Sequence, residues 1–168
     1  MKKCFKNIPC DQFKAVMRRF AANVNVITSA DGGLLNGMTA TAVCSVTAEP
    51  PSVLVIVNKT NRSHPIIRNS GAFAVNVLSL AQQDIALHFA SRVADPFSTI
   101  DFSVGKTGCP IIAGSDAHVE CVVIKEVELG THTIFVGEVV ASDLSDGEPL
   151  LYHGGQYRRL EQAQDAFA

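Results

Sequence analysis

The segment from Ala117 to Leu129 constrains the fold more than any other part of the sequence, because its apolar residues recur at every second position. Apolar residues fill the odd positions, broken only by Lys125. This two-residue period is typical of a β-strand with one buried face and one face turned to water. The water-facing positions are expected to hold the ionisable side chains of the segment, which are His118, Glu120, Glu126 and Glu128.

Other segments predict further strands, separated by turn residues. Residues 23–28 alternate and end at Asp31-Gly32-Gly33, a typical hairpin turn. A long Thr- and Val-rich strand is expected over 35–46, and a mostly buried one over 52–58 after Pro50-Pro51. The remaining strands are predicted at 72–78, at 131–141 with both faces apolar, and as two short strands around Gly154-Gly155.

Helical patterns are few and short. After Asp11, an apolar stripe runs from Phe13 to Phe20 at helical spacing. A second helix is expected from Ser63, as its N-cap, to Gly71, and a third over 81–90, with Asp95-Pro96 marking its end. Many strands with few helices predict one mainly β, antiparallel domain over residues 1–168, arranged as a barrel rather than a doubly wound sheet.

Charge and cysteine usage narrow the partners and the compartment. The net charge is −2, so neither nucleic acid nor an anionic membrane is an expected partner. Five cysteines are scattered without CxxC or zinc spacing, which is typical of free thiols in a reducing compartment. No signal peptide pattern follows the basic start, and no apolar run is long enough to span a bilayer, so a cytoplasmic location is expected.

Motifs for self-contained chemistry are missing from the sequence. There is no GxGxxG, HExxH or GxSxG pattern, and the P-loop-like Gly105-Lys106-Thr107 lacks its earlier glycine, because Ile100 stands there. His118 and Glu120 could share a strand face as half of a metal site, but without a third ligand a solvated pair is favoured and no metal is predicted. An enzyme of this kind would borrow its chemistry from a cofactor.

The most informative stretch is Leu35 to Thr47, where small and hydroxyl residues alternate. Such residues let a flat ring approach the backbone, although a lone Thr-rich strand is usually only a strand. With Ala21–Thr28, Phe73–Leu78, His88–Ala90, Gly130–His132 and Gly155–Tyr157, it resembles the flavin reductase family of two-component monooxygenases. This is a group of antiparallel Greek-key split β-barrels with a few short flanking helices, and includes the reductase partner of 4-hydroxyphenylacetate hydroxylase. The resemblance runs from about Phe13 to Tyr157.

The resemblance implies a set of flavin-binding residues. The ring and ribityl chain would contact the segment from Met38 to Ala42 with Ser45 nearby, and the phosphate would lie near the turn at Asn58 and beside Arg92. His132 would lie where nicotinamide stacks on the flavin, as the catalytic positioning residue. Arg62 departs from the pattern of many relatives and would either favour the extra phosphate of FAD or face water. The implied cofactor-binding residues are Met38, Thr39, Ala40, Thr41, Ala42, Ser45, Asn58, Lys59, Thr60, Ser63, Phe89, Ala90, Ser91, Arg92, Gly155 and Tyr157.

The implied activity is hydride transfer from NADH or NADPH to FMN or FAD, with NADH favoured because no arginine cluster awaits a 2′-phosphate. A homodimer would cover the flavin, and reduced flavin would diffuse to a separate oxygenase. Two alternatives remain open at this point. One is a reductase of iron or a corrinoid that retains its flavin, and the other is a non-catalytic flavin-binding protein of the same fold.

Overall fold

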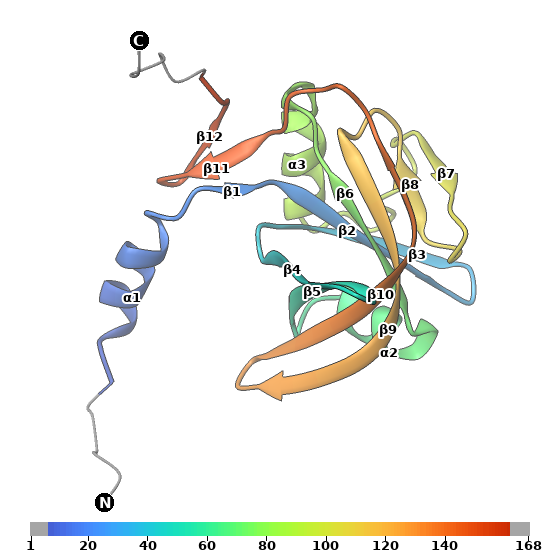
Figure 1. The fold of residues 1–168 in the computed structure, drawn as a ribbon. Coiled ribbons are helices and arrows are strands. Elements are labelled where there is room, and N and C mark those ends of the chain that lie inside the picture. The colour runs from blue at the N-terminus through green and yellow to red at the C-terminus, as the bar shows by residue number, and fades with distance from the viewer. Residues whose placement is uncertain (1–6, 162–168) are drawn as a thin grey trace, which may run out of the picture.

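The computed structural model describes residues 7–161, and its main element is a seven-stranded antiparallel sheet. The order of the strands across the sheet is β3, β2, β6, β9, β10, β5, β4 (Figure 1). Their bounds are β2 Asn25–Asp31, β3 Leu34–Ala40, β4 Val43–Ala48, β5 Pro51–Asn58, β6 Ala72–Val77, β9 Ala117–Leu129 and β10 His132–Leu144. The mainly β, antiparallel prediction is therefore confirmed.

The two edge strands of this sheet are neighbours in the chain. Strands β3 and β4 stand at opposite ends of the strand order, yet only Thr41 and Ala42 separate them. Because two residues span at most about 10 Å, the sheet must curl until its two edges approach each other at this link. The prediction of one strand over 35–46 was wrong: the chain leaves the hydrogen bonds to β2 at Ala40 and takes up those to β5 at Val43.

Short elements complete the fold. The hairpin predicted at Gly32-Gly33 is confirmed, since both glycines have positive φ and join β2 to β3. Two small sheets accompany the main one. The sheet of β7 and β8 was not predicted. The other was predicted in part, because its hairpin of β11 and β12 was expected but the pairing of β1 with β11 was not. Their bounds are β1 Ala22–Asn23, β7 Phe102–Val104, β8 Pro110–Ile112, β11 Leu151–His153 and β12 Gln156–Arg158.

The predicted helices are present with shifted ends. They are α1 Cys10–Met17, α2 Ser63–Ser70 and α3 Gln83–Ala90, which follows the short 3₁₀ helix η1 Leu80–Gln82. Gly71 ends α2 in the left-handed conformation, as expected. Ser63 is not the N-cap, because Arg62 holds that position and the Ser63 hydroxyl is engaged elsewhere. Helix α3 ends at Ala90, before Asp95-Pro96.

Strand β2 divides the core into two parts. On one face, Ile27 joins a cluster with Phe73, Phe135 and Ile67 of α2. On the other face, Val26 joins a cluster built around Phe89 of α3. Residues 25–29 are consequently buried on both faces of β2, although their sequence alternates. The sheet thereby fixes α2 and α3 relative to each other.

Helix α1 extends away from this body (Figure 1). Its apolar stripe is present, but none of its residues is buried, and Phe13, Val16 and Phe20 are about half exposed or more. Among residues 7–161, no helix is both long and apolar enough to cross a membrane. Of the five cysteines, Cys4 lies outside the described residues, and Cys10, Cys44, Cys109 and Cys121 are free thiols.

Candidate functional site

A cleft of about 490 Å³ opens between the start of α2 and the end of α3. One wall is the turn after β5, and the opposite wall is the segment from His88 to Pro96. Six predicted cofactor residues meet here, namely Asn58, Thr60, Phe89, Ala90, Ser91 and Arg92. The other lining residues are Asn36, Gly37, Asn61, Arg62, His88, Val93 and Pro96.

Hydrogen bonds within the turn after β5 hold one wall in place. The side chain of Asn58 accepts bonds from the N–H and hydroxyl of Thr60, both at 2.9 Å. The side chain of Asn61 accepts a bond from the N–H of Ser63 at 2.9 Å. The hydroxyl of Ser63 is fully buried and accepts a 2.7 Å bond from the Asn36 amide. Ser63 therefore supports the wall from behind and does not line the cleft.

The opposite wall is tied to α2 by Arg62. Its guanidinium donates to the carbonyl of Val93 and, at 3.4 Å, to that of Ala94. A second bond of 2.8 Å joins His88 Nε2 to the carbonyl of Pro96. The lining contains two arginines and no carboxylate. A cleft with this donor set suits an anionic ligand such as a phosphate.

A smaller hollow of about 230 Å³ lies at the end of β3. It is lined by the predicted residues Thr39, Ala40, Thr41, Ala90 and Tyr157, together with Val24 and Tyr152. Ala90 lines both hollows, so the two are neighbours. Thr39 donates to the carbonyl of Ala86 at 2.6 Å, which anchors β3 to α3. The side chain of Met38 packs in the core, so only its backbone is left to meet a ligand.

Seven predicted residues line neither hollow: Met38, Ala42, Ser45, Lys59, Ser63, Gly155 and His132. Ala42 belongs to the two-residue link between β3 and β4, and Ser45 is exposed on β4. Gly155 is exposed at the turn between β11 and β12, where its φ of 85° suits glycine. His132 is half-buried at the start of β10, directly opposite Asn58 of β5. The register therefore puts His132 next to the strand end from which the wall of the larger cleft begins.

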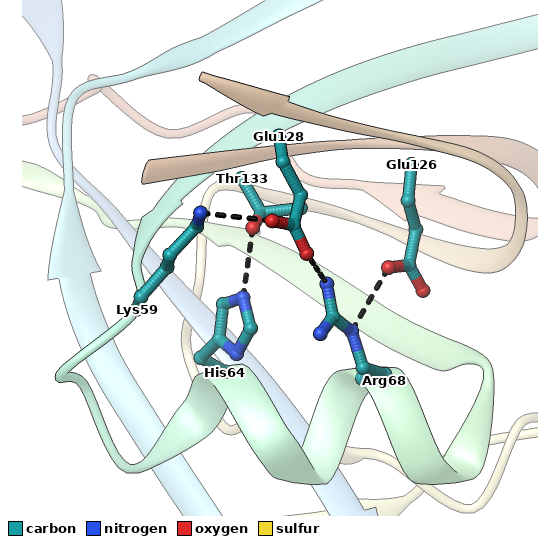
Figure 2. A network of polar contacts seen from close by, with 6 residues as sticks. All are labelled: Lys59, His64, Arg68, Glu126, Glu128 and Thr133. Carbon is teal, nitrogen blue, oxygen red and sulfur yellow. Dashed lines mark hydrogen bonds and ion pairs between the residues drawn. The ribbon is translucent and has the colours of Figure 1, made fainter. Parts of the chain in front are cut away.

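Lys59 is absent from the lining of the larger cleft, and its side chain is directed to Glu128 (Figure 2). Its ammonium donates to Glu128 at 2.9 Å, and Arg68 donates to Glu128 at 2.7 Å and to Glu126 at 3.0 Å. The bonds from Lys59 and Arg68 lower the pKa of Glu128 to about 2. The Arg68 pairs join α2, and the Lys59 pair joins the turn before α2, to the tip of the β9–β10 hairpin, which carries His132.

A buried hydrogen bond lies beneath these ion pairs. His64 Nε2 is 2.8 Å from the hydroxyl of Thr133, and both residues are buried (Figure 2). Burial, with the nearby positive charge of Arg68, lowers the pKa of His64, so its neutral form is favoured. The base of the hairpin tip is thus held by neutral groups, while charged groups hold its surface.

Glu120 corrects the expectation of a solvated strand face. It is only 4% exposed, and its carboxylate accepts bonds from the N–H and hydroxyl of Thr107, at 2.7 and 2.8 Å. The alternation over residues 117–129 correctly predicted strand β9, but the turn between β7 and β8 covers the face of β9 at Glu120. Among residues 7–161 there is no cluster of three metal-ligating side chains, and the Glu120 carboxylate is occupied by Thr107.

The residues of the larger cleft that sequence reasoning missed come from strand β3, from turns and from the end of α3. They are Asn36, Gly37, Asn61, His88, Val93 and Pro96. A usable signal for Asn61 was the pair of asparagines three residues apart in the turn after β5, because asparagine side chains often build such turns. Val93 and Pro96 line the cleft because the chain after α3 passes along it, and no local sequence pattern predicts that path.

The arrangement favours binding over self-contained catalysis. The larger cleft offers two arginines and several amides and hydroxyls, which can bind a phosphate chain. In the smaller hollow, Ala40 and Ala90 leave room for a flat ring joined to that chain. The lining of the two hollows offers no carboxylate or thiol to act as base or nucleophile. A ligand bound there would have to supply the reactive group.

Comparison with known proteins gives consistent results. The family described as "Flavin reductase like domain" matches residues 17–161. The NADH-dependent FMN reductase RutF of Stutzerimonas stutzeri is 36% identical over 156 residues, which is 91% of this chain and 90% of the relative. The reductase component of 4-hydroxyphenylacetate 3-monooxygenase from Pseudomonas aeruginosa is 33% identical, over 89% of this chain and 91% of the relative. The structure of the NADH:FAD oxidoreductase SgcE6 of Streptomyces globisporus superposes with a TM-score of 0.88 at 36% identity, covering 95% of this chain and 99% of that one.

Proposed function

The chain belongs to the family of flavin reductase-like domains, and we propose that it is an NADH-dependent flavin reductase that supplies reduced flavin to a separate flavin-dependent monooxygenase. The observation that carries the proposal is the pair of neighbouring hollows at Ala90, whose linings include ten of the sixteen cofactor-binding residues that the family resemblance implies. The relatives named as NADH-dependent flavin reductases and as a monooxygenase component support the same activity.

The donor set fits a flavin. Thr39, Ala40 and Thr41 offer small side chains and backbone groups at an open edge, where a flat ring can lie against the strand. The larger cleft offers arginine and amide donors for a phosphate. A bound flavin supplies the acceptor for the hydride of the nicotinamide, which no side chain here can replace.

The protein's own contribution is positioning. The hydrogen bonds of Thr39 to Ala86 and of Arg62 to the segment after α3 fix the two hollows relative to each other. His132 would place the nicotinamide, and its Nδ1 lies 2.9 Å from the hydroxyl of Thr131, which restricts the ring's rotation. Catalysis is then mainly proximity and alignment of two rings.

A homodimer completes this proposal. Val46, Val122, Ile124, Val127 and Leu129 are exposed on strands β4 and β9, and the stripe of α1 is exposed as well. Apolar side chains that gather on an exposed surface mark an interaction site, and we assign these residues to contact with a second copy that would cover the flavin edge near Thr41 and Ser45. We further propose that the curled sheet closes as a Greek-key split barrel in a single domain over the whole chain. We also propose that the protein is cytoplasmic, a compartment that suits its free thiols.

The proposal is tested by mixing the purified protein with NADH and either FMN or FAD. We expect the NADH absorbance to fall only when flavin is present, and the protein to leave gel filtration without bound flavin. No NADH oxidation with either flavin would overturn the proposal. A protein that stays yellow through the column would instead indicate a reductase that retains its flavin.

The role of His132 has its own test, the variant His132→Ala. We expect the rate of flavin reduction at saturating flavin to fall roughly tenfold, because removing one positioning contact costs on the order of 1.4 kcal/mol in the transition state. The Kd for oxidised flavin, measured by fluorescence, is expected to change much less. Equal losses in rate and flavin affinity would place His132 in the flavin site rather than at the nicotinamide.

A further inference from the structure

We propose that this chain prefers FAD over FMN, and that the larger cleft receives the pyrophosphate and adenosine of FAD between Arg62 and Arg92. The inference rests on the proposed reductase function and names the substrate of that same site. The relatives do not decide the choice, since one reduces FMN and another FAD.

The arrangement of the two hollows is the first support. The ring-binding residues Thr39 to Thr41 line the smaller hollow of about 230 Å³, and the larger cleft of about 490 Å³ begins on the other side of Ala90. A ligand whose ring lies on β3 therefore extends into the larger cleft. That volume lies within the roughly 300–1,000 Å³ typical of sites for whole drug-sized ligands, so the cleft is larger than a single terminal phosphate requires.

Charge is the second support. The whole chain has a net charge of −2, yet the cleft is lined by two arginines and by no carboxylate. Attraction for an anion is therefore local to this cleft. The monoester of FMN and the pyrophosphate of FAD each carry close to two negative charges near pH 7, so the two arginines suit either flavin by charge. The pyrophosphate of FAD suits them by its length, because it offers one phosphate to each arginine.

The placement of Arg62 is the third support. It crosses from the start of α2 to the carbonyls of Val93 and Ala94, and so is held at the cleft instead of moving freely in water. A guanidinium has five N–H donors, and these two carbonyls occupy only part of them. Arg62 can therefore fix the wall and bind a phosphate oxygen at the same time.

The far wall offers a surface for the adenine. Val93 is half-buried and Pro96 is buried, and both line the cleft beyond Arg92. His88 fixes Pro96 by its 2.8 Å bond to the Pro96 carbonyl. An apolar wall held in place next to two arginines suits an adenosine that follows a pyrophosphate.

The test measures the Kd values of FAD, FMN and riboflavin by flavin fluorescence in the absence of NADH. We expect FAD to bind at least about tenfold more tightly than FMN, because a further charge-assisted contact contributes on the order of 1.4 kcal/mol or more. Arg62→Ala should weaken FAD binding by about tenfold and riboflavin binding much less, because riboflavin has no phosphate and loses only the support that Arg62 gives to the cleft wall. Arg62→Lys should restore only part of the affinity, since lysine cannot bind the two carbonyls and a phosphate in the same planar geometry.

Arg159→Ala is the matched control, because Arg159 is exposed and lines neither hollow. It should leave all three Kd values unchanged. Equal affinities for FAD and FMN, or an Arg62→Ala variant that loses riboflavin equally, would overturn the inference. NADH oxidation that proceeds equally well with FMN would leave the reductase function standing, whereas absence of oxidation with every flavin would remove that function as well.

Discussion

Strand β9 carries carboxylates near both of its ends, and the two ends hold them in different ways. Near its start, Glu120 is 4% exposed and is bound by the N–H and hydroxyl of Thr107. Near its tip, Glu126 and Glu128 stay in contact with water and pair with Lys59 and Arg68 (Figure 2). One end of the strand is held by neutral donors in the interior and the other by opposite charges on the surface.

The pKa values show why the two ends differ in energy. Burial alone would raise the pKa of Glu120, but bonds from the backbone and hydroxyl of Thr107 and from the backbone of Lys106 outweigh it and lower the pKa. At the tip, bonds from Lys59 and Arg68 lower the pKa of Glu128 to about 2. Removing a buried acceptor strands its donors away from water, whereas the groups freed at the tip are solvated again.

The largest expected effect is therefore that of Glu120→Ala. The Thr107 N–H and hydroxyl would lose their charged acceptor, and the turn between β7 and β8 would lose its two bonds to β9. We expect the free energy of unfolding to fall by about 3 kcal/mol, measured by urea denaturation. The control Glu126→Ala, on the same strand, should cost only about 0.5 kcal/mol. Equal losses would mean that the two ends of β9 do not differ as described.

The same contrast limits what sequence alone could predict. The alternation over 117–129 correctly gave a strand, because alternation follows from the backbone period. It also placed Glu120, Glu126 and Glu128 on one wet face, and this was wrong for Glu120. A turn more than ten residues earlier covers that position, and no local pattern in β9 records a long-range contact.

The candidate site shows the same division. The segment from Thr39 to Thr41 could be recognised from its small and hydroxyl residues, and it lies at an open hollow. The family resemblance implied that Lys59 and Ser63 help to hold the phosphate, but Lys59 turns to Glu128 and Ser63 is buried against Asn36. Which side of a turn a residue faces depends on the partners it meets, and these come from β9 and β3.

A pH titration of stability provides a second test of the buried end. Because the folded pKa of Glu120 lies below its ordinary value of 4.5, its contribution is fully present above that value and is lost as the pH falls through the lower folded pKa. Glu120→Gln should thus be less stable than the original protein at pH 7, by about 1–2 kcal/mol. The gap should narrow below pH 4.5 in urea titrations. A gap independent of pH would show that the carboxylate charge contributes nothing.

A third variant, Thr133→Val, separates the interior of the hairpin tip from its surface. The Thr133 hydroxyl is fully buried and bonds to His64, so its removal leaves a buried ring nitrogen without a partner. We expect a loss of about 1 kcal/mol in the free energy of unfolding, insensitive to salt. A loss that disappears in high salt would show that the ion pairs above, and not this bond, hold the tip.

The smallest effect is expected from Glu128→Gln at the surface of the tip. Its partners Lys59 and Arg68 are both partly exposed, so water replaces the lost contacts and the urea midpoint should move least of all the variants. Whatever shift remains should vanish in about 1 M salt, where the screening length falls to about 3 Å.

Because His132 begins the strand that follows this tip, the informative measurement is the KM for NADH at low and high salt. A KM that rises at low salt without a change in unfolding midpoint would show that the surface ion pairs position the hairpin tip rather than stabilise the fold, whereas a large midpoint shift would remove the distinction between the two ends of β9.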